Sequence, residues 1–320
     1  MTHPLGLFDA VILGIVEGVT EYLPVSSTGH LVLAKSLLGL DSASDVERSV
    51  NALLIVIQGG AILAVLGLYR KAVGRMILGV LGKDPGGLLL FRNILIAFLP
   101  AAVLGPFLDD WIEARLFRPI PVLLALGVGG IVMILADRRL RDRGDRISNA
   151  TDRTGADLSA RAAFQIGLLQ CVAMWPGTSR SMVTILGGMF VGLRPARAAE
   201  FSFLLGLPTL GGATVFKLAK NMSGEGPDMF AVLGWAPVLL GLAVATLSAA
   251  LAVRWLVSWL TRHGLAAFGW YRIGLTAVLV PLVIAGVVSI GPEVQDDQSA
   301  EAATAPEMIA PSDPTTIVRR

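Results

Sequence analysis

Two short polar segments interrupt long apolar stretches of the chain, and they constrain its fold more than any other feature. The first is EGVTEYLPVSSTGH at 17–30, and the second is WPGTSRS at 175–181. A charged side chain at the centre of a bilayer costs about 2.5–3.5 kcal/mol even on the mildest insertion scale. Backbone that leaves the helix at that depth is tolerated only inside protein or beside a wet cavity. The chain must therefore fold both segments into its own interior.

The apolar stretches are those of a polytopic, all-α membrane protein. Hydrophobic residues make up 54% of the 320 residues, charged residues make up 16%, and the mean hydropathy is +0.70. A soluble domain carries about 25% charged residues, so this class is excluded. Six windows have the roughly 20 residues that cross the hydrocarbon core. They lie at 51–69, 91–107, 119–136, 198–216, 233–253 and 271–290.

The two interrupted regions do not read as single spans. Residues 8–40 and 162–193 each hold two short apolar pieces, one on either side of a polar break. Each piece is too short to cross the membrane comfortably. We therefore expect two re-entrant hairpins, each made of a helix, a break and a second helix.

The two breaks also resemble each other. Sliding the chain on itself by about 152 residues pairs Ser26 with Thr178 and Ser27 with Ser179. Each half of the chain then holds one hairpin and three spans. Because three is an odd number of crossings, the second half should be inverted relative to the first. Inverted repeats with broken helices in matching positions indicate a binding site near the bilayer midplane.

The repeat divides the chain into four parts. We expect a first repeat at 1–136, a loop at 137–161, a second repeat at 162–290 and a tail at 291–320. The loop holds seven arginines, which place it in the cytoplasm by the positive-inside rule. The tail is rich in Pro, Ala and acidic residues, a composition typical of disorder.

The arginine loop fixes the expected orientation of the other segments. Counting outward from it, the basic turn from Arg70 to Lys83 falls inside, whereas the segment DDWIEARLFR at 109–118 and both termini fall outside. The first hairpin then enters from the outer face and the second from the cytoplasm. We expect the pocket between them to open to the outer, periplasmic face.

The first break combines acids, hydroxyls and an imidazole. Glu17 and Glu21 are four residues apart, so they share one face of a helix. Pro24 ends this helix, because it disfavours helical geometry at the preceding residue. Any of Ser26, Ser27 and Thr28 can then cap a second helix that begins near Gly29 and His30.

The second break supplies a cation. Pro176 and Gly177 end one helix, and Thr178 or Ser179 caps the next. The two new helices would aim free N–H groups at a shared point, which is an anion site suited to phosphate. Arg180 adds a planar guanidinium that binds phosphate oxygens with two hydrogen bonds.

Each of these residues also has a purely structural interpretation. The two glutamates can be a structural pair, the serines can be simple caps, His30 can be a satisfied core group, and Arg180 can reach an interface. Tyr271 and Arg272 are interpreted first as an interface anchor and second as a substrate contact. Carboxylate, hydroxyl, imidazole and guanidinium together suit phosphoryl transfer, which needs a nucleophile, a base and charge stabilisation.

The motifs resemble those of a known family. EGVTEYLPVSSTGH and PGTSRS, together with EFSFLLGLP at 200–208 and FGWYRIGL at 268–275, are similar to the bacterial undecaprenyl-diphosphatases of the bacitracin-resistance type. The likeness runs from about residue 5 to 290. It implies an inner-membrane hydrolase that converts undecaprenyl pyrophosphate to undecaprenyl phosphate, the lipid carrier recycled for peptidoglycan synthesis.

The resemblance also implies site residues and a cofactor. The family's acidic motif falls on Glu17 and Glu21, its serine and histidine on Ser26, Ser27 and His30, and its arginine motif on residues 176–181. We therefore expect catalytic roles for Glu17, Glu21, Ser27, His30 and Arg180, and substrate binding by Ser26, Thr28, Gly177, Thr178, Ser179 and Ser181. The family is associated with a divalent cation, Mg²⁺ or Ca²⁺, for which Glu17 and Glu21 are the candidate ligands. The expected partners are the polyprenyl pyrophosphate, membrane lipids and a second copy of the chain, and not nucleic acid.

Several mechanisms remain open at this point. Ser27 can attack the terminal phosphorus with Glu21 or His30 as base, His30 can itself be the nucleophile, or a metal-activated water can attack. A different function class is also open, because inverted repeats with broken helices are equally typical of a secondary transporter or a lipid flippase. The cluster of hydroxyl, histidine and arginine favours the enzyme, since transport does not require it.

Overall fold

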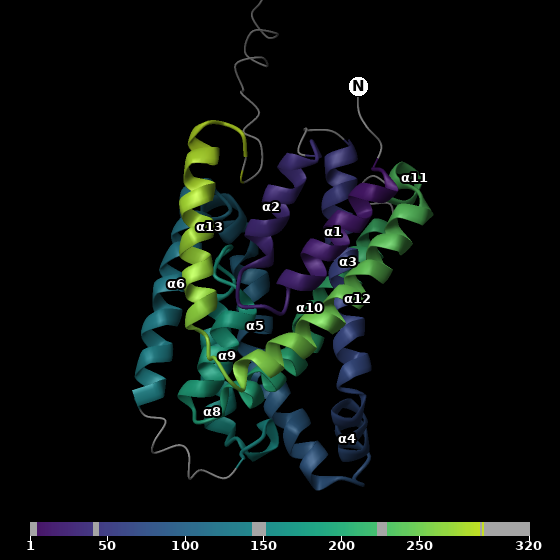
Figure 1. Ribbon diagram of the computed structural model, residues 1–320. Coiled ribbons are helices and arrows are strands. Elements are labelled where there is room, and N and C mark those ends of the chain that lie inside the picture. Colours follow the sequence, from purple (N-terminus) through teal and green to yellow (C-terminus); the bar gives the residue numbers. More distant parts are fainter. Residues whose placement is uncertain (1–4, 41–44, 143–151, 223–228, 289, 291–320) are drawn as a thin grey trace, which may run out of the picture.

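A computed structural model describes residues 5–40, 45–142, 152–222, 229–288 and 290, and all regular structure in these ranges is helical. The predicted all-α class is therefore confirmed for the described part of the chain (Figure 1). The predicted tail at 291–320 and much of the arginine loop lie outside the described residues. The helices are α1 (Leu7–Thr20), α2 (Ser27–Leu37), α3 (Asp45–Leu68), α4 (Arg70–Val80), α5 (Pro85–Leu116), α6 (Pro119–Asp142), the 3-10 turn η1 (Gly155–Asp157), α8 (Ala160–Val172), α9 (Arg180–Phe190), α10 (Pro195–Met222), α11 (Met229–Leu233), α12 (Trp235–Leu260) and α13 (Ala266–Ile284).

Four of the described helices are long and apolar enough to cross a membrane. The spanning segments are Pro85–Leu108, Pro119–Arg139, Trp235–Leu260 and Ala266–Ile284. They coincide with four of the six predicted spans, which supports a multi-pass membrane protein. The other two predicted spans, 51–69 and 198–216, fall on α3, which ends at Leu68, and on α10, and these helices are not among the four.

Two predicted connections are helical instead. The basic turn after residue 69 is helix α4, which packs against the start of α5. The approach is close because a Cβ added at Gly79 would collide with the backbone of Leu88. The segment 109–118 was expected to be an outer connection, but α5 continues through it as far as Leu116. A helix that is already nucleated extends readily through residues of fair helix propensity such as those of this segment.

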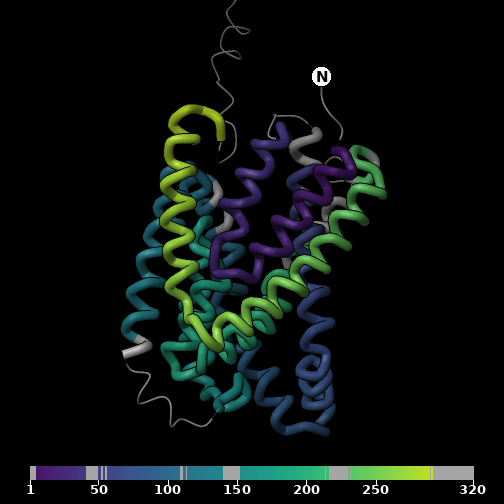
Figure 2. Tube along the Cα trace, viewed as in Figure 1, coloured from purple at the N-terminus to yellow at the C-terminus, as the bar shows by residue number. Residues whose placement is uncertain are grey.

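Both interrupted regions fold as a helix, a break and a second helix. α1 ends at Thr20, several residues before Pro24, and α2 begins at Ser27. α8 ends at Val172, and α9 begins at Arg180. Figure 2 shows the first hairpin in the upper half of the molecule and the second in the lower half.

The two breaks share an unusual backbone conformation. Ser26 and Ser179 are the N-caps of α2 and α9, and each has φ of 75°. They are the non-glycine residues with positive φ in the described part of the chain. α2 begins at 27 and α9 at 180, so the two helix starts are 153 residues apart. The predicted pairing of Ser26 with Thr178 uses a shift of 152 residues, one fewer, because it places a gap before the prolines.

Each hairpin packs against a helix from the other half of the chain. α1 lies along α12, where a Cβ added at Gly14 would come within 2.7 Å of the Gly241 carbonyl oxygen. α8 lies along α5, where Gly167 meets the backbone of Ala97 in the same way. Glycine is needed at these positions because two backbones approach closely there.

The breaks lie inside protein, as their composition required. Tyr22, Leu23 and Val25 of the first break belong to the largest apolar cluster, together with Met182 and Phe203. The ring of Tyr22 meets that of Phe203 edge to face at a centroid distance of 5.2 Å. The backbone that leaves the helix is thus shielded from lipid by side chains of both halves.

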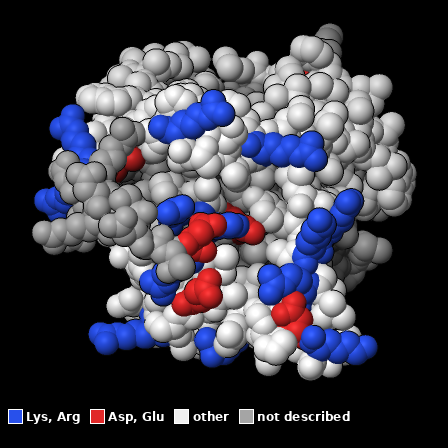
Figure 3. All heavy atoms as spheres, turned by 60° about the horizontal axis from the view of Figure 1, so that its bottom comes forward, with Lys and Arg blue, Asp and Glu red and all other residues white. Residues whose placement is uncertain are grey.

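Basic side chains gather at one end of the molecule. Figure 3 shows Lys and Arg distributed over the end that lies at the bottom of Figure 1, with acidic residues among them. α4, which lies at this end, exposes Arg70, Lys71 and Arg75.

Candidate active site

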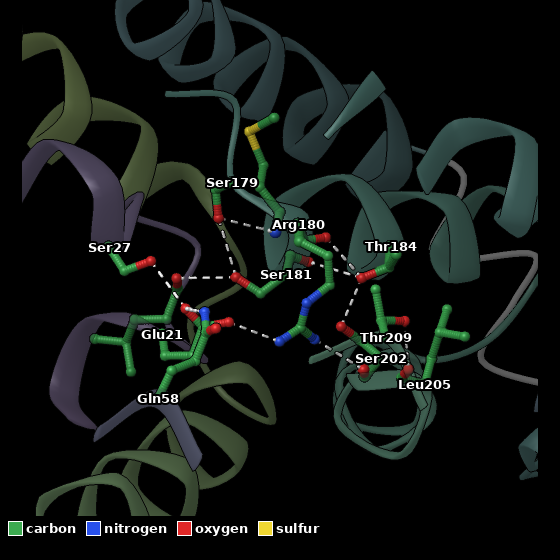
Figure 4. A network of polar contacts seen from close by, with 12 residues as sticks. Glu21, Ser27, Gln58, Ser179, Arg180, Ser181, Thr184, Ser202, Leu205 and Thr209 are labelled. Atoms are coloured by element: carbon green, nitrogen blue, oxygen red, sulfur yellow. Dashed lines mark hydrogen bonds and ion pairs between the residues drawn. The ribbon is translucent and has the colours of Figure 1, made fainter. Parts of the chain in front are cut away.

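The two breaks meet at an ion pair. The Arg180 Nη2 atom donates to Glu21 Oε1 at 2.9 Å, and the side chains are only 10% and 5% exposed. Glu21 caps the end of α1, and Arg180 is the first residue of α9. Figure 4 shows both side chains pointing toward the same central space. A buried ion pair is retained only with good geometry and further hydrogen bonds, so its surroundings matter.

Glu21 accepts hydrogen bonds from two more side chains. The Ser27 hydroxyl donates to Glu21 Oε2 at 2.8 Å, and the Gln58 amide donates to the same oxygen at 3.4 Å. The serine is thus within hydrogen-bond reach of a carboxylate that can take its proton. This is the nucleophile-and-base relationship found in enzymes that form covalent intermediates.

Arg180 is held in one orientation. Its Nη1 atom donates to the Ser202 carbonyl at 3.1 Å, and the guanidinium lies 5.2 Å from the centre of the Tyr22 ring. A Cβ added at Gly206 would come within 3.0 Å of the Nη1 atom, so a larger residue there would crowd the guanidinium. These contacts fix the planar fork and aim it at Glu21.

The other hydroxyls of the second break connect the two breaks. Ser179 accepts from the Met182 N–H at 3.3 Å, and its hydroxyl lies 3.0 Å from that of Ser181. Ser181 is fully buried and donates to the Leu23 carbonyl at 2.9 Å. Ser181 therefore joins the start of α9 to the first break (Figure 4).

Three polar groups of the first break are buried without a hydrogen-bond partner among the described residues. They are the carboxylate of Glu17, which is 1% exposed, the hydroxyl of Tyr22, which is fully buried, and the hydroxyl of Ser26, which is 2% exposed. An unsatisfied buried carboxylate is costly, which indicates a binding role. The described residues contain no group of three or more His, Cys, Asp or Glu side chains that would hold a metal alone. Glu17 with Glu21 nevertheless fits Mg²⁺, which binds through one or two carboxylates and completes its shell with phosphates and water.

His30 lies against a different neighbour. Its Nδ1 atom is 2.7 Å from the Ser26 carbonyl oxygen, and its Nε2 atom is 2.7 Å from the Tyr271 hydroxyl. The His30 and Tyr271 rings are stacked, with an interplanar angle of 3°. Both ring nitrogens are therefore engaged away from Ser27.

The remaining predicted site residues line the breaks. Thr28 is half-buried in the first turn of α2, and Thr178 is buried next to Ser179. Gly177 has φ of +92°, and its carbonyl accepts from Arg272 Nη2 at 2.9 Å. A Cβ at Gly177 would collide with the Val122 carbonyl, so glycine is needed there for both conformation and space.

Three residues that contact this site were not predicted to belong to it. Gln58 of α3 donates to Glu21 at 3.4 Å. Ser202 lies in the quoted segment EFSFLLGLP, and Tyr22 lies in the first break, but neither was assigned a role. Arg272 has two interpretations from the sequence: the first, an interface anchor, is wrong because its side chain is fully buried, and the second, a substrate contact, stays a prediction. Its position next to Tyr271 in an apolar segment was the available signal.

Comparison with known proteins identifies similar chains. A family model described as "Bacitracin resistance protein BacA" matches residues 10–278. A protein of Sorangium cellulosum named undecaprenyl-diphosphatase is 45% identical over 275 residues, which cover 85% of each chain. A protein of Rhodospirillum rubrum named undecaprenyl-diphosphatase 2 is 44% identical over 283 residues, which cover 88% of this chain and 97% of the relative. A third, undecaprenyl-diphosphatase 1 of Paraburkholderia xenovorans, is 41% identical over 280 residues.

Proposed function

Since the chain belongs to the bacitracin resistance protein BacA family, we propose that it is an undecaprenyl-diphosphatase. It hydrolyses undecaprenyl pyrophosphate to undecaprenyl phosphate and inorganic phosphate, returns the lipid carrier to cell-wall synthesis, and confers bacitracin resistance. The observation that carries this proposal is the contact of Arg180 with Glu21 and of Glu21 with Ser27, which unites both breaks in one polar site.

Arg180 and the two helix starts bind the diphosphate. The guanidinium can give two parallel hydrogen bonds to phosphate oxygens, and a bound phosphate would share it with Glu21. The first turns of α2 and α9 add backbone N–H groups and the positive end of the helix dipole. Tyr22 and Ser202 hold the guanidinium in place, so little reorganisation is needed at the moment of reaction.

Ser27 carries the phosphoryl group. Its oxygen attacks the terminal phosphorus while its proton passes to Glu21, and the bond from that phosphorus to the bridging oxygen breaks to release undecaprenyl phosphate. Water then attacks the phosphoserine, and the products are inorganic phosphate and the free serine. The 2.8 Å contact between Ser27 and Glu21 favours Glu21 as base over His30, whose nitrogens bond Ser26 and Tyr271.

Glu17 and Glu21 are the residues that would hold a divalent cation. Such a cation, when bound, supplies charge neutralisation to phosphate oxygens. Glu17 fits this role because both of its buried oxygens lack a partner among the described residues. One turn of helix separates the two carboxylates, so they lie on the same face of α1.

We also propose that the two halves are inverted repeats. Three observations support this: the common offset of 153 residues in both hairpins, the matching positive φ at Ser26 and Ser179, and the exchange of partners between α1–α12 and α8–α5. The position of one hairpin in the upper half of Figure 2 and the other in the lower half agrees with entry from opposite faces. The halves are residues 1–136 and 162–290, joined by the arginine loop.

The proposed location is the bacterial inner membrane, with the basic end in the cytoplasm. The exposed cations of α4 lie at that end, and α6 ends there. The pocket then opens to the periplasmic face.

Release of phosphate in detergent tests the function. Purified protein with undecaprenyl pyrophosphate and Mg²⁺ should yield equal amounts of inorganic phosphate and undecaprenyl phosphate, whereas Arg180→Ala should yield neither. Arg254→Lys, an exposed change on α12, should be as active as wild type. Lipid binding by wild-type protein without any phosphate release would instead favour a transporter.

A further inference from the structure

Two adjacent residues of α13 reach the two different breaks. We propose that Tyr271 and Arg272 are positioning residues that hold the backbone of the breaks, Tyr271 through His30 and Arg272 directly. The inference rests on the proposed function, because it concerns how Ser27 and Arg180 are placed for phosphoryl transfer. It also assigns His30 to positioning rather than to the chemical step.

Arg272 ties the second break to α6. Its Nη2 atom donates to the Gly177 carbonyl at 2.9 Å and to the Ala125 carbonyl at 3.0 Å, and its Nε atom donates to the Leu126 carbonyl at 3.1 Å. A buried guanidinium is costly, and here it donates to three main-chain oxygens of two segments. The Trp175 indole N–H, which donates to the Pro121 carbonyl at 3.1 Å, joins the same two segments. Gly129 leaves room for it, since a Cβ there would collide with the guanidinium.

Tyr271 ties the first break to α13 through His30. The Ser26 carbonyl can only accept, so His30 Nδ1 donates to it, and in a neutral ring Nε2 then accepts from the Tyr271 hydroxyl. The two bonds use both nitrogens of the imidazole and fix its tautomer. The Tyr271 hydroxyl thus orients the imidazole of His30, and the imidazole in turn holds the Ser26 carbonyl.

Both carbonyls lie just before the start of a helix. Ser26 lies one residue before the start of α2, and Gly177 lies three residues before the start of α9. Both residues have positive φ, as does Ser179 between Gly177 and Arg180. Strained conformations of this kind persist only where surrounding contacts enforce them. The contacts from α13 meet this need, and they aim Ser27 and Arg180 at Glu21.

Two replacements of His30 separate positioning from chemistry. The side-chain amide of His30→Asn can still donate to the Ser26 carbonyl, whereas His30→Ala cannot. We expect the asparagine variant to keep at least a tenth of wild-type kcat and the alanine variant to lose 100-fold or more, both with KM within threefold. Equal and severe losses in both variants would assign His30 to the chemical step and overturn the proposal.

Tyr271→Phe tests the relay with a single hydroxyl removed. We expect Tyr271→Phe to have a 5- to 10-fold lower kcat with little change in KM. The double variant Tyr271→Phe with His30→Asn should lose no more activity than His30→Asn alone, because the effects of two residues that act through one contact are not additive. Tyr69→Phe is the matched control and should have wild-type activity. Independent, multiplying losses in the double variant would show that Tyr271 does not act through His30.

Arg272→Lys keeps the charge but cannot span three carbonyls. We expect at least a 10-fold loss of kcat at a temperature well below its melting point, with Arg254→Lys unaffected. A second readout does not depend on catalysis. Hydrogen exchange should be faster at 175–182 in Arg272→Lys and at 22–30 in Tyr271→Phe. If hydrogen exchange is unchanged in both segments, the positioning role is overturned, even when the wild-type protein is an active phosphatase. If exchange rises as expected but the wild-type protein releases no phosphate, only the proposed function is defeated.

Discussion

The Arg180 guanidinium lies 2.9 Å from the Glu21 carboxylate, although 159 residues separate the two along the chain. Neither half of the molecule therefore contains a complete site. The pair brings together the end of α1 and the start of α9, and it also links α10 through the Ser202 carbonyl. Changes at either residue should affect both stability and activity, in ways that can be separated.

Arg180→Met should lower stability more than the double change Arg180→Met with Glu21→Gln. Removing one partner of a buried ion pair typically costs about 3–5 kcal/mol, because the other charge stays buried and unpaired. The double variant removes that charge as well, so its melting temperature in detergent should be higher than that of the single variant. Both variants should be inactive. An equal or lower melting temperature for the double variant would contradict the buried pair.

Ser27→Ala should lower kcat by about 1,000-fold, which corresponds to about 4 kcal/mol of transition-state free energy. Brief reaction with substrate labelled at the terminal phosphorus should leave label on Ser27 in wild-type protein. Ser26→Ala is the matched control, because the Ser26 hydroxyl has no partner among the described residues and should be far less sensitive. Label on His30, or a Ser27→Ala enzyme with substantial turnover, would exclude Ser27 as nucleophile.

Glu17→Gln should raise the melting temperature while lowering activity. The buried carboxylate lacks a partner among the described residues, so the neutral amide removes a desolvation cost. We expect about a 100-fold loss of phosphate release and a weaker response of the rate to Mg²⁺. Glu200→Gln, which removes a pair with Arg197 on α10, is the control and should leave the Mg²⁺ response unchanged. A destabilised Glu17→Gln protein would mean that Glu17 has a structural partner.

Ser26→Gly should stabilise the protein by about 1 kcal/mol, because glycine adopts positive φ without the steric cost that serine bears. Ser179→Gly should gain less, since it also removes the hydroxyl that accepts from the Met182 N–H. Denaturation of the two variants in the same detergent measures the difference. A larger gain for Ser179→Gly would reverse the ranking expected from the two caps.

Asp84 should make stability depend on pH at the basic end. Its hydrogen bond from Arg75, and then that from the Gly87 N–H, lower the pKa of the carboxyl below its usual value. A group whose pKa is lower in the folded state stabilises it above the unfolded pKa of about 3.9, and that stabilisation is lost as pH falls through the folded value. Asp84→Asn should therefore have a lower melting temperature than wild type at pH 6–8, and the difference between the two melting temperatures should disappear as the pH approaches 3. A difference that does not depend on pH would exclude the ion pair as its cause.

Much of the candidate site could be predicted from the sequence, because polar side chains in apolar, membrane-spanning segments must be buried within the protein. Glu21, Ser27 and Arg180 stood out for that reason, and their breaks had to meet inside protein. The role of Arg272 could not be predicted, because its three acceptors are main-chain carbonyls, which carry no residue-specific signal. The predicted shift of 152 residues pairs the prolines of the two breaks, whereas the two serines with positive φ are 153 residues apart.

Helix α4 was missed for a different physical reason. Its charged residues suggested a turn, but Met76 and Gly79 form a face that packs against α5. Such short amphipathic helices are stabilised by tertiary packing rather than by their own propensity. α5 continues past its apolar window for another reason, because a helix that is already nucleated extends through residues of fair helix propensity.

The packing of α1 on α12 has a consequence for biosynthesis. Ser248 donates to the Gly14 carbonyl at 3.1 Å, so α1 meets a partner that is made 234 residues later. Glu21 finds Ser27 and Gln58 soon after α1 is made, whereas the glycine surface of α1 has to wait for α12. Synthesis of α12 thus completes the environment of α1.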